Sequence, residues 1–335
     1  MGRVNAHTTE HTTHAHQGVV RVEHLSKTFG PVQAVDHLSF EVGPGRVTGF
    51  LGPNGAGKTT TLRMLLGLVR PTSGSATIDG HHYHSIPQPG RVVGAALEAA
   101  SFHPGRSARD HLRVYAPHIG ASDARCDEVL DLVGLSSAAN RRAGGFSLGM
   151  RQRLGLAATL LGDPKVLLLD EPANGLDPEG IAWLRSFLRY LASEGRTVLI
   201  SSHVLSEVQQ TVDDVIIIAR GRLVHASSLA ELAELTTKRV LVTSPDVERL
   251  DRLVGERWPG QVEAAGIPGS VLISDVDPAT VGAAAFGAGL EVHELARRDV
   301  GLEDIFLRLT GEPEAPPADG LSAIPTVPAT EGGAA

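Results

Sequence analysis

A glycine-rich stretch in the first quarter of the chain has the residue types that bind phosphate. It reads GPNGAGKTT, with four residues between Gly52 and Gly57, followed by Lys58 and Thr59. Glycines let backbone N–H groups turn inward around a β-phosphate, a lysine reaches the β- and γ-phosphates, and a threonine hydroxyl ligates Mg²⁺. An apolar run precedes this stretch and a helical pattern follows it, so the sequence predicts a P-loop that binds a nucleoside triphosphate with Mg²⁺. The residues expected at the nucleotide are Gly52, Pro53, Asn54, Gly55, Ala56, Gly57, Lys58, Thr59 and Thr60.

Two further stretches carry groups that could hydrolyse the bound nucleotide. In KVLLLDEPANGLDP an apolar strand pattern ends in Asp170, placed to hold Mg²⁺, and Glu171 follows, close enough to polarise the attacking water. In TVLISSHVLSEV a β-branched run ends at His203, for which we favour a γ-phosphate contact over a core histidine. The pattern indicates nucleotide hydrolysis with Glu171 and His203 as the catalytic residues.

Ser147 opens a basic, Leu-rich stretch, FSLGMRQRLGLA, with a helical pattern. A serine at a helix N-cap, together with free backbone N–H groups and the positive end of the helix dipole, forms a site for an anion such as phosphate. The residues alone leave open whose phosphate this site would hold.

The order of these motifs resembles that of the ATP-binding cassette (ABC) transporter ATPases over residues 19–226. Ser147 lies 89 residues after Lys58, Asp170 lies 23 residues after Ser147, and NGLD and His203 follow. The resemblance implies that the nucleotide is ATP and that the signature residues Ser147 and Gly149 contact ATP held by the P-loop of a second copy. Leu148 stands where the family usually has Gly, and Met150 where it often has Gln.

Three other positions take their roles from the resemblance. Phe29, in LSKTFG, matches the aromatic residue that stacks on adenine, and the alternative is a core phenylalanine at a strand end. Glu98 occupies the place of the family's glutamine, which senses Mg²⁺ and the attacking water and touches the transport partner. Asp177 resembles the loop that couples the two ATP sites of a dimer. The expected Mg²⁺ contacts are Thr59, Asp170 and Glu98.

The sequence looks most like the free-standing ATPases of bacterial drug and antibiotic exporters, because of FSLGMRQRL, Glu98 and the ending GLEDIFLRLTG. This resemblance implies a separate membrane permease, a homodimer on ATP, and a location at the cytoplasmic face of the cell membrane. The alternative is an ABC-type ATPase of a non-transport machine. DNA-repair forms need a long coiled coil between P-loop and signature, ribosome-acting forms carry two cassettes, and neither feature is visible. A GTPase would need an Asn-Lys-x-Asp motif, which is absent, whereas an importer stays open.

Composition agrees with these expectations. The chain has 335 residues, of which 42% are hydrophobic and 20% charged, a balance typical of globular proteins. No run approaches 18 apolar residues, so no membrane span is expected. The single cysteine, Cys126, fits a reducing compartment. The net charge of -8 argues against nucleic acid as a partner.

The elements that must position these motifs predict an α/β fold. Strand patterns (VVRVEHL, RVTGFLG, VLLLD, TVLIS, DVIIIA) alternate with helices, which is typical of a mixed, mostly parallel sheet in a P-loop NTPase core. We expect this core over residues 18–228, with an inserted helical subdomain at about 105–162. A small α+β domain, ferredoxin-like, follows over 229–310. The flanking segments 1–17 and 311–335 are expected to be disordered tails.

Two groups of histidines could in principle bind a metal ion. We favour a solvated tail and a solvated loop, because neither group has the fixed geometry of a metal site, and we expect no ligands among His7, His11, His14, His16, His81, His82 and His84.

Overall fold

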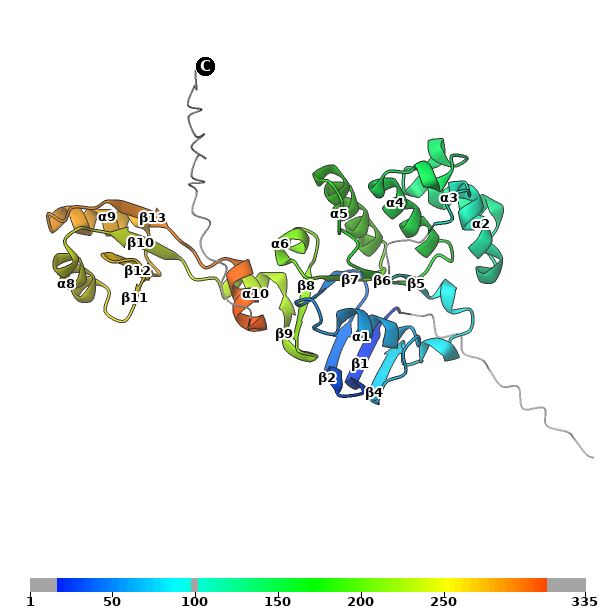
Figure 1. Ribbon diagram of the computed structural model, residues 1–335, viewed down its shortest axis with the longest axis horizontal. Helices are drawn as coiled ribbons and strands as arrows, with labels where there is room; N and C mark the ends of the chain where they lie inside the picture. The colour runs from blue at the N-terminus through cyan, green and yellow to red at the C-terminus, as the bar shows by residue number, and fades with distance from the viewer. Residues whose placement is uncertain (1–16, 98–101, 312–335) are drawn as a thin grey trace, which may run out of the picture.

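The centre of the molecule is a six-stranded, mostly parallel sheet (Figure 1). The computed structural model describes residues 17–97 and 102–311. The strands lie in the order β5, β6, β7, β3, β8, β9, and only β8 and β9 pair antiparallel. Their bounds are β3 (Val47–Leu51), β5 (Val93–Ala96), β6 (Val166–Asp170), β7 (Thr197–Ser202), β8 (Asp214–Ala219) and β9 (Arg222–Ser228). The predicted α/β fold with a mixed, mostly parallel sheet is confirmed.

A second, antiparallel sheet packs against one face of the parallel sheet, with helix α1 (Lys58–Leu65) between them (Figure 1). Its strands lie in the order β2, β1, β4, and their bounds are β1 (Val20–Phe29), β2 (Val32–Val42) and β4 (Ser73–Ile78). The stretch VVRVEHL, predicted as a strand of the parallel core, therefore lies outside it. The reason is its pattern: Val20 and Val22 are buried whereas Arg21 and Glu23 are exposed, as in a sheet buried on one face only.

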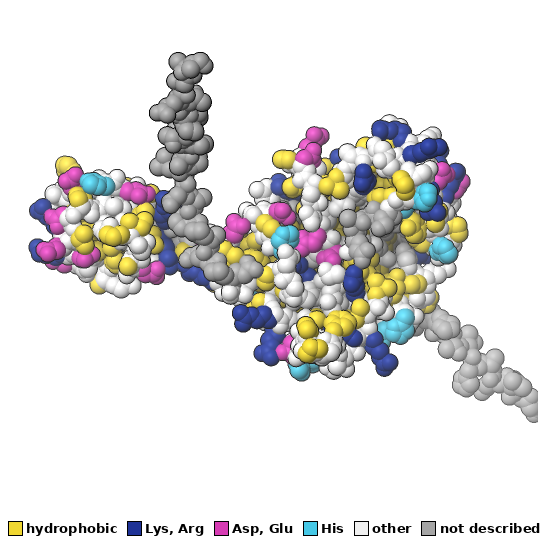
Figure 2. All heavy atoms as spheres, in the orientation of Figure 1, with side chains coloured by type: hydrophobic (Ala, Val, Ile, Leu, Met, Phe, Trp, Pro, Cys, Tyr) yellow, Lys and Arg dark blue, Asp and Glu magenta, His cyan; other side chains and the backbone are white. Residues whose placement is uncertain are grey.

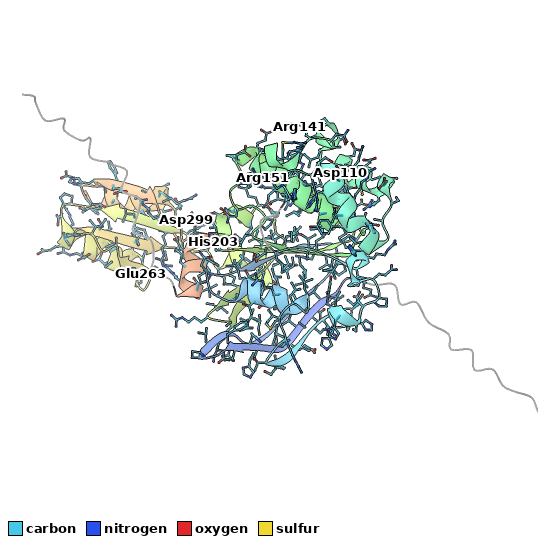
Figure 3. All side chains as sticks on the ribbon, turned by 45° about the vertical axis from the view of Figure 1, so that its right-hand side comes forward. Asp110, Arg141, Arg151, His203, Glu263 and Asp299 are labelled. Carbon is cyan, nitrogen blue, oxygen red and sulfur yellow. The ribbon has the colours of Figure 1, made fainter. Side chains whose placement is uncertain are left out.

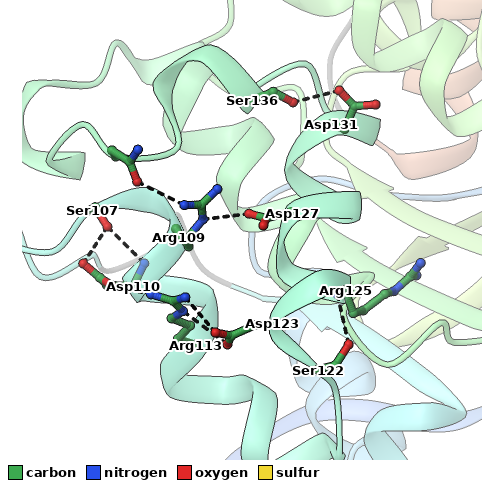
Figure 4. Close-up of polar contacts among 11 residues, drawn as sticks. Ser107, Arg109, Asp110, Arg113, Ser122, Asp123, Arg125, Asp127, Asp131 and Ser136 are labelled. Atoms are coloured by element: carbon green, nitrogen blue, oxygen red, sulfur yellow. Dashed lines mark hydrogen bonds and ion pairs between the residues drawn. The ribbon is translucent and has the colours of Figure 1, made fainter.

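Three helices form the subdomain inserted between β5 and β6: α2 (Ala108–Ile119), α3 (Asp123–Leu132) and α4 (Leu148–Thr159). Each begins at a serine whose side chain accepts a backbone hydrogen bond, namely Ser107, Ser122 and Ser147. Ion pairs join α2 to α3, with Arg109 Nε 2.7 Å from Asp127 and Arg113 Nη2 2.7 Å from Asp123 (Figure 4). Single 3₁₀ turns lie at Tyr83–Ser85, Pro89–Arg91, Ser136–Ala138 and Ala143–Gly145.

Helices α5 (Pro178–Ser193) and α6 (Leu205–Val208) cover the same face of the parallel sheet as the inserted subdomain. The buried side of α5 carries Leu184, Leu188 and Leu191 at helical spacing, and the helix packs on strands β7 and β3. We call the two sheets with helices α1 to α6 the P-loop domain. No helix among residues 17–97 and 102–311 is long and apolar enough to cross a membrane.

A four-stranded antiparallel sheet with two helices forms a separate lobe, which we call the C-terminal unit (residues 238–299; Figures 1 and 2). Its elements are β10 (Arg239–Thr243), α8 (Val247–Arg257), β11 (Val262–Ala264), β12 (Ser270–Ser274), α9 (Pro278–Gly287) and β13 (Glu294–Arg297). The strand order β11, β12, β10, β13 is that of a split βαββαβ unit. Both helices pack on one face of the sheet, over Val240, Val242 and Ile273.

Helices α7 (Leu229–Glu234) and α10 (Leu302–Thr310) pack on the P-loop domain, although the sequence places both in the C-terminal domain. Leu232, Ile305 and Phe306 are buried in the core that contains β8, and α10 lies beside α6. The chain thus leaves the P-loop domain, forms the C-terminal unit and returns. An amphipathic stripe shows only that a helix needs an apolar partner, so its sequence could not tell which core it joins. The predicted tails, apart from Gln17 and Gly311, lie outside the described residues.

Phe306→Ala should lower the free energy of unfolding of the P-loop domain by about 3–5 kcal/mol, because its side chain, 3% exposed, would leave a cavity under α10. Differential scanning calorimetry measures the loss. The matched control is Phe286→Ala on α9, since that ring is 88% exposed and its removal should change stability by less than about 0.5 kcal/mol. Equal losses from the two variants would show that α10 is not part of this core.

Candidate nucleotide site

The predicted motifs meet at one edge of the parallel sheet. The P-loop follows β3, Asp170 ends β6, and His203 follows β7, which lies between those two strands. Since parallel strands end at the same edge of a sheet, three segments far apart in sequence converge there, as ligand sites of open α/β sheets do. The carbonyl oxygen of Ser202 accepts a hydrogen bond from Gly52 N–H at 3.3 Å, which ties the P-loop to β7.

The P-loop, residues 52–60, has the backbone shape that phosphate binding requires. Gly55 and Gly57 have φ angles of +80° and +105°, a region that favours glycine. Gly57 precedes α1 without a side-chain cap, so the first N–H groups of the helix are available to an anion. Lys58 is buried, and its Nζ donates to the carbonyl oxygens of Gly52 at 2.6 Å and Pro53 at 3.2 Å. The predicted contacts Asn54 and Ala56 lie on the same loop, and Thr60 lies in the first turn of α1.

Thr59 and Asp170 form an oxygen pair beside the P-loop. The hydroxyl of Thr59 donates to Oδ2 of Asp170 at 2.7 Å, across 111 residues of sequence. A hydroxyl and a carboxylate side by side are oxygen donors of the kind Mg²⁺ takes in nucleotide sites. These residues therefore fit a magnesium ion. The third predicted Mg²⁺ contact, Glu98, lies outside the described residues.

Glu171 is held in an uncommon backbone conformation next to Asp170. Its φ angle is +48°, a left-handed value that is uncommon for residues other than glycine. Its Oε2 lies 2.9 Å from Nδ1 of His203, and its Oε1 lies 3.7 Å from Nζ of Lys58. The two predicted catalytic side chains, Glu171 and His203, are thus in direct contact. Figure 3 shows His203 on the side of the P-loop domain that faces the C-terminal unit.

Ser201 belongs to this cluster and was missed by sequence reasoning. Its hydroxyl donates a short hydrogen bond to Oδ1 of Asp170 and accepts the backbone N–H of Glu171 at 2.9 Å. A polar residue in the apolar run TVLISS was the available signal. The pairing of β6 with β7, which sets Ser201 directly beside Asp170, could not be deduced from the sequence.

The signature residues Ser147 and Gly149 lie at the start of helix α4 and not at the strand ends that carry the other motifs. Ser147 caps α4 and accepts the N–H of Met150 at 3.2 Å, as the sequence predicts. Gly149 has an open side, because a Cβ atom added to it would meet its nearest neighbour, Leu176 Cδ2, only at 3.9 Å. Asp177 is exposed and caps α5 through the N–H of Gly180 at 2.8 Å. Within the described residues, no hydrogen bond or ion pair joins Ser147 or Asp177 to the P-loop of the same chain.

Phe29 ends strand β1 and is 49% exposed, with Lys27 Nζ 4.8 Å from its ring centre. A half-exposed ring is available for stacking, whereas the alternative of a core phenylalanine would require burial. The exposure of Phe29 therefore agrees with the stacking role that the sequence predicts.

A groove of about 570 Å³ lies between the inserted subdomain and the rest of the P-loop domain. Its lining includes Tyr83, Leu97, Phe102, His111 and Tyr115. His111 is buried, its Nδ1 has no hydrogen-bond partner among the described residues, and burial lowers its pKa below the ordinary value. The groove therefore offers aromatic surface to a binding partner.

Comparison with known proteins identifies relatives of both parts of the chain. A family model described as ABC transporter matches residues 35–174, and a domain of unknown function (DUF8746) matches residues 237–303. The uncharacterized ABC transporter ATP-binding protein YdbJ of Bacillus subtilis (strain 168) is 36% identical over 295 residues, which are 87% of this chain and 95% of YdbJ. The bacitracin transport ATP-binding protein BcrA of Bacillus licheniformis is 43% identical over 210 residues, which are 62% of this chain and 69% of BcrA.

A solved structure of an ATP-binding subunit of an ABC transporter superposes with a TM-score of 0.58 at 26% identity. The match covers 64% of this chain and 92% of that chain. The P-loop NTPase fold expected from the sequence is therefore shared with a known ATP-binding subunit.

Proposed function

The chain belongs to the family of ABC transporter ATP-binding subunits, and from this premise we propose that it powers export of a drug, antibiotic or other small molecule through a separate membrane permease. ATP binding and hydrolysis follow from the family. Export is supported by the relative BcrA, whose name assigns it to bacitracin transport. The contact between Glu171 and His203 beside the P-loop carries the hydrolytic part of the proposal.

The positions of the individual residues support the following roles in hydrolysis. The P-loop N–H groups and Lys58 bind the β- and γ-phosphates, and Thr59 and Asp170 would hold the magnesium ion. Bound Mg²⁺ neutralises charge that develops on the phosphoryl oxygens. Glu171 polarises the attacking water. Nδ1 of His203 lies 2.9 Å from the Glu171 carboxylate, so His203 orients that carboxylate and also contacts the γ-phosphate.

A second copy of the chain completes each site in this proposal. Ser147 and Gly149 present a hydroxyl and free helix N–H groups, and among the described residues neither has a partner in the P-loop of its own chain. An anion held there must come from elsewhere, and the ATP of a second copy fits. Asp177, exposed at the start of α5, would couple the two sites across that interface.

The permease is proposed to dock in the groove beside Phe102, His111 and Tyr115. A short amphipathic segment of the partner would cover the aromatic surface of the groove. Docking there would place the chain at the cytoplasmic face of the membrane.

A strain from which the gene for this chain has been deleted tests export and docking together. Restoring the wild-type gene should return the chain to the membrane fraction and return resistance to at least one compound in a panel that includes bacitracin. Tyr115→Asp puts a charge on the apolar wall of the groove, at a side chain that is 43% exposed. We expect this variant to restore neither property while it keeps basal ATPase activity, because Tyr115 lies outside the nucleotide site.

Two outcomes would contradict this proposal. Unchanged resistance on deletion, with ATPase activity present in the purified chain, would favour the import or non-transport alternatives. Membrane attachment that persists in cells without the permease would show that the chain does not depend on it for its location.

A further inference from the structure

Ser201 occupies a buried position between two residues of the nucleotide site. It lies on β7, is fully buried, and pairs in register with Asp170 on the parallel neighbour β6. Side chains paired in register on adjacent strands project to the same face of the sheet. The hydroxyl of Ser201 is therefore placed beside the carboxylate of Asp170 by the sheet itself.

The single hydroxyl of Ser201 makes two hydrogen bonds with different consequences. The Ser201 hydroxyl donates a hydrogen bond to Oδ1 of Asp170. The other carboxylate oxygen, Oδ2, accepts a hydrogen bond from the hydroxyl of Thr59 at 2.7 Å. Asp170 is thereby held at both oxygens. The lone pair of the Ser201 hydroxyl accepts the N–H of Glu171 at 2.9 Å.

That second hydrogen bond supports the backbone of Glu171 where it is strained. A non-glycine residue with φ of +48° persists only if its surroundings stabilise it. Without the Ser201 hydroxyl as acceptor, the N–H of Glu171 would face the buried end of β7 with no hydrogen-bond partner. An unsatisfied buried donor is destabilising. The peptide unit would then turn toward another acceptor, and the Glu171 carboxylate would leave His203.

We propose that Ser201 is a positioning residue for ATP hydrolysis, because one hydroxyl aligns both the carboxylate of Asp170 and the backbone of Glu171. The inference rests on the proposed roles of these two acids. Ser201 is fully buried, so it would act through these two acids. It orients the magnesium-holding carboxylate and the water-polarising carboxylate relative to one another.

Ser201→Ala removes both hydrogen bonds and tests the inference. Loss of a residue that orients a metal ligand typically costs 10- to 100-fold in activity or metal affinity. We therefore expect kcat to fall by about 10- to 100-fold and the Mg²⁺ concentration for half-maximal activity to rise. The KM for ATP should change much less, because the P-loop is untouched. Ser201→Thr keeps a hydroxyl and should recover part of kcat.

Thr197→Val is the matched control on the same strand. Thr197 is also fully buried, and its hydroxyl donates to the carbonyl oxygen of Gly18 at 2.6 Å, away from the nucleotide site. The control loses one buried hydrogen bond without touching Asp170 or Glu171. We expect it to lower the melting temperature as Ser201→Ala does, with kcat and the Mg²⁺ midpoint unchanged. If Ser201→Ala folds poorly, the same comparison is made between Ser201→Thr and Ser201→Cys, whose thiol is a weak hydrogen-bonding group.

The outcomes separate this inference from the proposed site. If Asp170→Asn shifts the Mg²⁺ midpoint while Ser201→Ala matches wild type, the inference is wrong and the site stands. If Thr197→Val reproduces the loss of kcat, or Ser201→Thr is no more active than Ser201→Ala, the hydroxyl of Ser201 has no positioning role. If Asp170→Asn leaves the Mg²⁺ dependence unchanged, the proposed magnesium site itself fails.

Discussion

Glu171→Gln should bind ATP with wild-type affinity and lose nearly all turnover. Binding depends on the P-loop and on Mg²⁺, whereas only the transition state needs the carboxylate that polarises the water. A positioned general base contributes about 10²- to 10⁴-fold, and we expect kcat to fall by that factor. ATP that is bound but not hydrolysed should hold two chains together. Light scattering with and without MgATP measures the change from monomer to dimer.

The matched control for this variant is Glu179→Gln, the same substitution in the first turn of α5, where the side chain is exposed. It should leave kcat and oligomeric state unchanged. A Glu171→Gln chain that binds ATP and stays monomeric would refute the proposed two-chain site, and one that retains high turnover would show that Glu171 is not the base.

Two inactive variants should restore activity to one another when mixed. Ser147→Arg replaces the phosphate-binding hydroxyl with a bulky cation, and Lys58→Ala removes the charge partner of the β- and γ-phosphates. In a mixed dimer the intact P-loop of the first variant faces the intact Ser147 of the second, so one complete site forms. With random mixing, half of the dimers are mixed and half of their sites are intact, which gives about a quarter of wild-type turnover.

This complementation separates two uses of Ser147. If Ser147 served the ATP of its own chain, every site in the mixture would keep one defect, and mixing would restore nothing. Coupling between sites could lower turnover, so ATP-dependent dimerisation is measured in the same samples. Failure of both measurements, in a mixture shown to exchange subunits, would mean that the FSLGMRQR stretch does not complete a neighbour's site.

Local chemistry in the sequence was enough to predict the loop and the helix cap of the candidate nucleotide site. A P-loop needs glycines, a lysine and a threonine at fixed spacing because the chain itself wraps the phosphates, and the structure has that loop between β3 and α1. The capping role of Ser147 was likewise local, because an N-cap and its helix are adjacent in sequence. Apolar runs buried on both faces, such as VLLLD and DVIIIA, correctly predicted the parallel sheet.

Tertiary structure alone decided which distant residues touch. Ser201 lies beside Asp170 because β7 pairs with β6, and nothing in either strand's composition specifies that neighbour. Helix α10 returns to the P-loop domain after the whole C-terminal unit, although its apolar stripe would suit either core. Hydrophobic burial is non-directional, so a sequence records that a face must be covered, and the packed fold determines what covers it.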